Sequence, residues 1–219
     1  MPMNSTLVTL VVCYTSIVAA AQDAPNPLSA GKRAPAGAVA RFSTGPWATP
    51  KARSACPVLL NRQHVKVAIY TRELTSDVVR LVQKIEKLVE KEPALKWSFV
   101  FVSHENDPTP SEAAYELQNE NIKRLALDEN ISHISIGLME RSTKSDQPTR
   151  RKRRLGFVGK DETVVMLIGP TPSGKSSFAK ILYLETVKSL ALSPEKTDTL
   201  VNSLTSAASE AVQELRATE

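Results

Sequence analysis

The sequence predicts an α/β fold built on a mostly parallel sheet. From residue 65 onward, β-branched runs typical of strands alternate with segments of helical periodicity, and short connections join them. The composition, 42% hydrophobic and 23% charged over 219 residues, is that of an ordinary globular chain with a sizeable core. One folded domain with appendages is therefore expected.

The regular pattern begins with a strand and a helix. VKVAIY (65–70) is a compact run rich in β-branched residues, which is typical of a buried strand. Apolar residues then recur at the 3.6-residue period from Val78 to Val89. Thr75 is a plausible N-cap, and Pro93 lies just past the end, so both helix boundaries carry a signal.

Three further strands and another helix follow. WSFVFVS (97–103) predicts the second strand, and Thr109 with Glu112 forms a capping box that opens the next helix. Apolar and polar residues alternate in HISIGLM (133–139), which predicts a third strand. The apolar run TVVMLIG (163–169) predicts a strongly buried fourth strand.

A phosphate-binding loop is the first of two interpretations of the next segment. Gly169, Gly174, Lys175 and Ser176 satisfy G-x-x-x-x-G-K-[ST] directly after a hydrophobic strand. Backbone N–H groups would wrap the phosphates of ATP, Lys175 would reach the β and γ oxygens, and Ser176 would hold magnesium. This interpretation predicts a nucleotide-binding phosphotransferase with ATP and Mg²⁺ as cofactors.

The second interpretation, which we favour, makes this loop a hairpin. Only 43 residues follow Ser176, and the last of them read as one terminal helix, so the further strands and the magnesium-orienting carboxylate of a nucleotide domain are missing. GPTPSGKS (169–176) is then a turn, and SFAKILYL (177–184) is an antiparallel strand that returns beside 163–169. No cofactor is expected in this case.

The resulting order of elements resembles the thioredoxin-like fold, with the extra strand HISIGLM similar to the peroxiredoxin-type elaboration. VKVAIYTRELTSDVVRLVQKIEKL, WSFVFVSHEND and KDETVVMLIG are similar to exported thioredoxin-like proteins of planctomycete-type bacteria. The resemblance covers about residues 56–215. It implies a three-layer sandwich: a central mixed sheet of about five strands with helices on both faces.

The chemical elements of that family are absent. The resemblance places the reactive thiol in the loop or first helical turn after the first strand, but residues 71–76 contain no cysteine. The family's cis-proline would stand at 160–163, where the sequence is Lys-Asp-Glu-Thr. The resemblance therefore implies a non-catalytic binding or scaffold domain without dithiol oxidoreductase activity.

The amino-terminal region predicts export. Residues 5–20 are apolar, uncharged and too short to span a membrane comfortably, and small residues follow them. We therefore expect a signal peptide over 1–21 and no membrane anchor after cleavage, with the mature chain in the periplasm, cell envelope or medium. Residues 22–55, rich in Ala, Pro and Gly, predict a disordered leader before a domain at 56–215.

Two features could carry an interaction. Cleavage would remove Cys13 and leave Cys56 as a free thiol without an internal partner, although simple burial is the plainer interpretation. The expected partner is a protein or an anionic component of the cell envelope. Specific nucleic-acid binding is not expected, because a net charge of +5 is far from a nucleic-acid-binding composition. The three histidines are too scattered along the sequence to predict a metal site. A candidate anion-binding loop, alternatively only a solvated one, is the run Arg150, Arg151, Lys152, Arg153 and Arg154.

Overall fold

The structure is a computed structural model in which one mixed sheet carries every described helix. It describes residues 28–35, 39–48, 56–58, 63–103, 111–139, 157–170 and 179–217. The strands are β1 (Ala40–Phe42), β2 (Lys66–Thr71), β3 (Phe99–Val102), β4 (Ser135–Met139), β5 (Glu162–Gly169) and β6 (Lys180–Lys188). The helices are α1 (Ser76–Lys91), the 3-10 turn η2 (Pro93–Leu95), α2 (Glu112–Asp128) and α4 (Pro194–Arg216).

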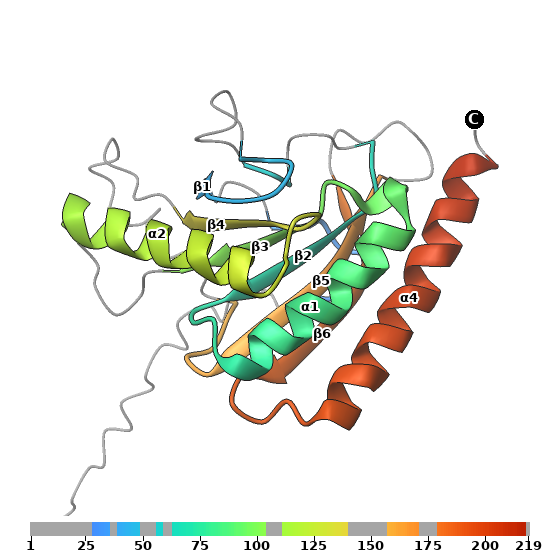
Figure 1. Cartoon of the computed structure of the whole chain (residues 1–219). Coiled ribbons are helices and arrows are strands. Elements are labelled where there is room, and N and C mark those ends of the chain that lie inside the picture. The colour runs from blue at the N-terminus through green and yellow to red at the C-terminus, as the bar shows by residue number, and fades with distance from the viewer. Residues whose placement is uncertain are drawn as a thin grey trace, which may run out of the picture.

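The sheet has the order β1-β4-β3-β2-β5-β6 (Figure 1). The strands β2, β3 and β4 are parallel, whereas β5, β6 and β1 join antiparallel to their neighbours. The predicted mixed α/β sheet is confirmed, with β1 as a sixth strand. One helix start differs: α2 begins at Glu112 with Ser111 as its N-cap, so Glu112 is the first helical residue and does not close a capping box with Thr109, which lies outside the described residues.

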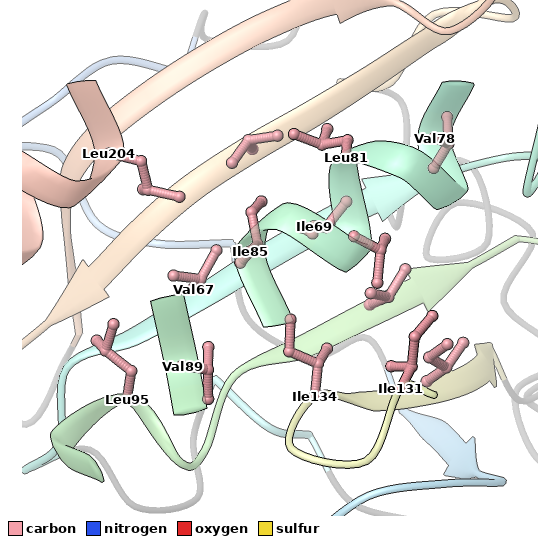
Figure 2. Close-up of a cluster of buried hydrophobic side chains, with 14 of the residues drawn as sticks. Val67, Ile69, Val78, Leu81, Ile85, Val89, Leu95, Ile131, Ile134 and Leu204 are labelled. Carbon is pink, nitrogen blue, oxygen red and sulfur yellow. The ribbon is translucent and has the colours of Figure 1, made fainter. Parts of the chain in front are cut away.

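The first face of the sheet carries the larger core. Successive side chains of a strand point to opposite faces, so Val67 and Ile69 of β2 share this face while Ala68 and Tyr70 share the other. Helices α1, α2 and α4 all pack on the first face, and Figure 2 shows α1 laying Leu81 and other apolar side chains over the strands. No described helix is long and apolar enough to cross a membrane.

The second face is covered differently. Within the described part of the chain no helix packs here, although the sequence predicts helices on both faces. Outside the strands of the sheet, the buried apolar residues of this face are Ala34, Trp47, Val58, Val158 and Ala179. Most of these precede β2, so residues before the predicted domain boundary at 56 complete the core.

The disordered leader predicted over 22–55 is therefore wrong for its described residues. Trp47 is 3% exposed, and its Nε1 donates to the carbonyl of Trp97 at 3.1 Å. Its backbone N–H donates to Ser135 Oγ at 2.9 Å, and Gly45 makes the turn at a φ of +73°. The burial of Phe42 and Trp47 supplies the apolar contact that the Ala, Pro and Gly content of the segment conceals.

A second part of the predicted leader pairs with the outer edge of β6. The N–H of Gly31 donates to the carbonyl of Ile181 at 2.7 Å, and the N–H of Ile181 donates to Lys32 at 2.9 Å. The N–H of Ala34 donates to Ala179 at 2.9 Å. The folded domain thus starts by about residue 28, while the predicted signal peptide over 1–21 lies outside the described residues.

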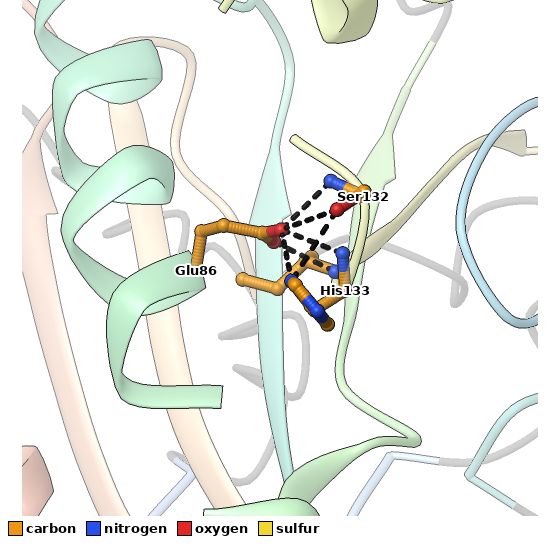
Figure 3. Close-up of polar contacts among 4 residues, drawn as sticks. Glu86, Ser132 and His133 are labelled. Carbon is orange, nitrogen blue, oxygen red and sulfur yellow. Dashed lines mark hydrogen bonds and ion pairs between the residues drawn. The ribbon is translucent and has the colours of Figure 1, made fainter. Parts of the chain in front are cut away.

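A buried carboxylate fixes the entry to β4. Glu86 projects from α1 and is 6% exposed. Its Oε1 accepts the backbone N–H groups of Ser132 and His133 at 2.7 and 2.6 Å, and its Oε2 accepts that of Ile134 at 2.8 Å (Figure 3). His133 Nδ1 lies 2.9 Å from the same carboxylate. One side chain therefore satisfies three backbone donors, and that of Ile134 would otherwise lie unpaired in the core.

Candidate functional site

The carboxyl end of β2 leads into the amino terminus of α1, which is where the resemblance places a reactive thiol. Thr75 caps the helix: its Oγ1 accepts the N–H of Val78 at 3.3 Å and donates to the carbonyl of Ser189 at 3.1 Å. Thr71 Oγ1 donates to the carbonyl of Glu73 at 2.8 Å. The hydroxyl groups of Thr71 and Thr75 therefore both donate to backbone carbonyls of neighbouring loops.

Three buried hydroxyls form a chain beneath this helix end. Thr163 Oγ1 donates to Thr71 Oγ1 at 3.1 Å and lies 2.8 Å from Ser189 Oγ. Thr71 and Thr163 are fully buried, and Ser189 is 6% exposed. The chain joins the end of β2, the start of β5 and the turn after β6. Its members satisfy one another, so they hold the elements together rather than present donors to a substrate.

The segment at the family's cis-proline position forms an ion pair instead. No peptide bond in the described residues is cis. Glu162 lies 2.9 Å from Lys188 Nζ and accepts the N–H of Gly159 at 3.0 Å. These bonds, with the one to Lys188 contributing most, lower the pKa of the Glu162 carboxyl, and the same contact raises the pKa of Lys188. The Lys188 ammonium is exposed to solvent, so this ion pair contributes little to the stability of the β5–β6 hairpin.

The phosphate-binding interpretation of this hairpin is not supported. β5 and β6 pair antiparallel from Glu162↔Lys188 to Gly169↔Lys180, so a strand stands where a nucleotide-binding loop would open a helix. Packing explains why residue 169 is glycine, because a Cβ there would come within 2.5 Å of the Leu182 side chain. Gly174, Lys175 and Ser176 lie outside the described residues. The competing hairpin prediction is confirmed by the pairing of β5 with β6.

The one described cysteine lies away from the helix terminus. Cys56 is half-buried against the second-face cluster and is not in a disulfide. The next residue, Pro57, accepts a hydrogen bond from Lys66 Nζ at 3.1 Å. Lys66 is fully buried at the start of β2, and Tyr70, four residues along the same face, is 1% exposed. The structure thus gathers a thiol, an amine and a phenol on the second face.

Sequence reasoning missed Lys66 and Tyr70. A lysine inside the β-branched run VKVAIY was the available signal, because a charged side chain is rarely fully buried without a partner. The predicted anion-binding loop at 150–154 remains untested, because it lies outside the described residues. Within the described ranges no group of three His, Cys, Asp or Glu side chains could hold a metal ion.

Burial makes Lys66 a source of pH dependence. Burial lowers the pKa of the Lys66 amine from 10.5 to about 8, and the charge of Cys56 opposes this shift by a smaller amount. Between pH 8 and 10 the unfolded chain therefore binds more protons, and the free energy of unfolding should rise with pH. Above about pH 10 the raised pKa values of Tyr70 and Tyr183, both caused first by burial, reverse this trend.

Replacing Lys66 with methionine tests this assignment. Lys66→Met should abolish the rise between pH 8 and 10 and increase the free energy of unfolding at pH 7 by about 3 kcal/mol, since a pKa unit corresponds to about 1.4 kcal/mol. Urea unfolding at several pH values measures both effects. Lys87→Met, at an exposed position of α1, is the matched control and should leave the profile unchanged.

Of the comparisons with known proteins, the one with solved structures agrees with this topology. No family model matches the chain, and no curated protein matches it. Among solved structures, a peroxiredoxin-like protein from Aquifex aeolicus is similar with a TM-score of 0.50 and 17% identity, over 84% of this chain and 90% of that one. The chain has a thioredoxin-like fold.

Two further solved structures are similar at lower scores. A thiol peroxidase from Chromobacterium violaceum has a TM-score of 0.49 and 11% identity, over 82% of this chain and 87% of that one. A DsbE-type thiol:disulfide interchange protein from Chlorobium tepidum has a TM-score of 0.47 and 13% identity, over 83% of this chain and 99% of that one.

Proposed function

We propose that this chain is a non-catalytic thioredoxin-like binding domain without dithiol oxidoreductase activity. The observation that carries the proposal is the hydroxyl chain of Thr71, Thr163 and Ser189 beneath the amino terminus of α1. Dithiol exchange needs a thiolate at such a helix end and a second thiol within reach of it. Here the side chains are hydroxyls, which do not undergo thiol–disulfide exchange.

The cysteine content supports the same conclusion. The chain has two cysteines, Cys13 and Cys56, which are far from a C-x-x-C spacing. Cys56 packs on the second face, whereas the apolar residues of α1, Val78 among them, pack on the first. Cys56 therefore does not replace the thiol missing at the helix terminus.

The partner is proposed on the sequence alone. A protein or an anionic component of the cell envelope, met by the basic run 150–154 after export, fits the charge of the chain and its predicted signal peptide. Specific nucleic-acid binding is not part of the proposal.

Turnover assays test the absence of redox catalysis. The full chain should reduce insulin disulfides in dithiothreitol, and consume a hydroperoxide in the presence of a thiol reductant, at the rates of the buffer alone. Cys56→Ser should give the same rates, since no catalytic cycle runs through that thiol. A rate at least ten times the buffer rate that disappears in Cys56→Ser would overturn the proposal.

A further inference from the structure

The outer edge of β6 is paired over only part of its length. β6 is the last strand of the sheet, and the segment 31–34 pairs antiparallel with its beginning at 179–181. From residue 182 to 187, no described residue forms a backbone hydrogen bond with this edge. An edge strand with unpaired N–H and C=O groups is a template on which another extended chain can pair.

A groove runs along this unpaired part of the edge. It lies between β6 and the first turns of α4, the helix beside β6 at this end of the sheet, and its volume is about 580 Å³ (Figure 1). The four consecutive residues 185–188 line it. Successive side chains of a strand point to opposite faces, so four in a row indicate that the backbone edge forms part of the wall. Val187, Leu192 and Leu200 give this β6–α4 groove an apolar base.

The charged side chains of the β6–α4 groove leave one carboxylate in excess. Glu185, Glu195, Lys188 and Lys196 line it. The Lys188 ammonium is paired with Glu162 at 2.9 Å, outside the groove. Among the described residues, neither Glu185 nor Glu195 forms an ion pair, so two carboxylates face the one ammonium of Lys196. A partner with a positively charged side chain therefore fits this groove better than one with a negatively charged side chain.

The described start of the chain leads away from the β6–α4 groove. The N–H of Lys32 donates to the carbonyl of Ser29 at 3.2 Å, and Gly31 makes this turn at a φ of +80°. Before the turn, Leu28 packs against the second-face cluster, whereas α4 packs on the first face. These contacts favour a separate polypeptide as the occupant of the groove.

We propose that the β6–α4 groove binds an extended segment of a partner protein in which apolar side chains flank a basic one. The partner's backbone pairs with 183–187 and extends the sheet, as the segment 31–34 already does further along the same edge. Its apolar side chains lie against Tyr183 and Val187, which belong to the first face. Its basic side chain lies opposite Glu185, between them. The inference rests on the binding part of the proposed function and names the class of partner.

Fluorescence anisotropy with a labelled, end-blocked peptide of sequence TVTRTVT tests this assignment. Its two valines and its arginine lie on one face at the spacing of Tyr183, Glu185 and Val187. The full chain should bind it with a dissociation constant of about 100 μM. The same peptide with methylated backbone nitrogens should bind at least about ten-fold more weakly, because it cannot donate to the edge. TVTETVT should bind about five-fold more weakly, because its glutamate meets Glu185.

Three variants at exposed positions locate the binding site. Thr199→Trp fills the groove from α4 and should weaken binding of TVTRTVT by about ten-fold or more, whereas Ser209→Trp, further along the same helix and outside the groove, should leave it unchanged. Glu185→Lys should reverse the preference, so that TVTETVT binds more tightly than TVTRTVT. Circular dichroism should show all three variants folded, because none of these side chains is buried.

Four results would overturn the proposal. They are no binding of TVTRTVT at about 1 mM, equal binding of its N-methylated form, equal losses in Thr199→Trp and Ser209→Trp, or an unchanged preference in Glu185→Lys. A dimer of the full chain in sedimentation that Thr199→Trp dissociates would also overturn it, by assigning the edge to a second copy. None of these results bears on dithiol chemistry, which the insulin and hydroperoxide assays decide separately.

Discussion

Trp47→Ala is expected to lower the free energy of unfolding by about 3–5 kcal/mol, the usual loss for truncating a buried aromatic residue. Trp47 lies 5.2 Å from Trp97 and 5.8 Å from Phe42 between ring centroids, and its indole nitrogen is hydrogen-bonded. Removing it would leave a cavity on the second face and free the turn that carries Gly45. Urea unfolding followed by far-UV circular dichroism measures the loss.

The control for this variant is Leu117→Ala. Leu117 is 65% exposed on α2, so its truncation should change the free energy of unfolding by less than about 0.5 kcal/mol. If Trp47→Ala behaved like Leu117→Ala, the segment before residue 56 would not belong to the folded core.

Glu86→Ala is expected to cost about 3 kcal/mol or more. The carboxylate accepts three backbone N–H groups at the entry to β4. The bond to Ile134 is buried, so leaving its donor unsatisfied costs roughly 1–3 kcal/mol, and the part-buried bonds from Ser132 and His133 contribute roughly 1 kcal/mol each. Glu86→Gln keeps the size of the side chain and one acceptor oxygen, so its loss should be smaller. The same urea titration ranks the two variants.

Glu90→Ala provides the matched comparison, because Glu90 lies one turn further along α1 and is exposed. It should leave the free energy of unfolding within about 0.5 kcal/mol of the parent. A loss in Glu86→Ala no greater than in Glu90→Ala would show that the contacts of Glu86 do not hold the 132–134 turn.

The sequence predicts the central elements of this fold because their patterns are local. The run VKVAIY, the 3.6-residue period after it and the apolar run TVVMLIG each identify an element within a few residues. The choice between a phosphate loop and a hairpin also follows from the number of residues that remain. The pairing of β5 with β6 confirms that choice.

The features that sequence reasoning missed depend on contacts between distant residues. β1 has three residues, too few to show alternation, and its burial comes from pairing with β4. Thr71, Thr163 and Ser189 are separated by up to 118 positions, so nothing local indicates that their hydroxyls meet. Glu86 looks like an ordinary surface position of an amphipathic helix until the 132–134 turn folds onto it.

Placing a cysteine pair at the start of α1 tests most directly whether missing thiols alone separate this chain from a dithiol thioredoxin. The cap contact from Val78 N–H to Thr75 Oγ1 brings these two positions together at a C-x-x-C spacing. Thr75→Cys with Val78→Cys should form an internal disulfide on oxidation and reduce insulin in dithiothreitol above the buffer rate, while the parent chain stays at that rate. A double variant that forms the disulfide but reduces insulin no faster than the buffer would contradict the account, and so would insulin reduction by the parent chain above the buffer rate.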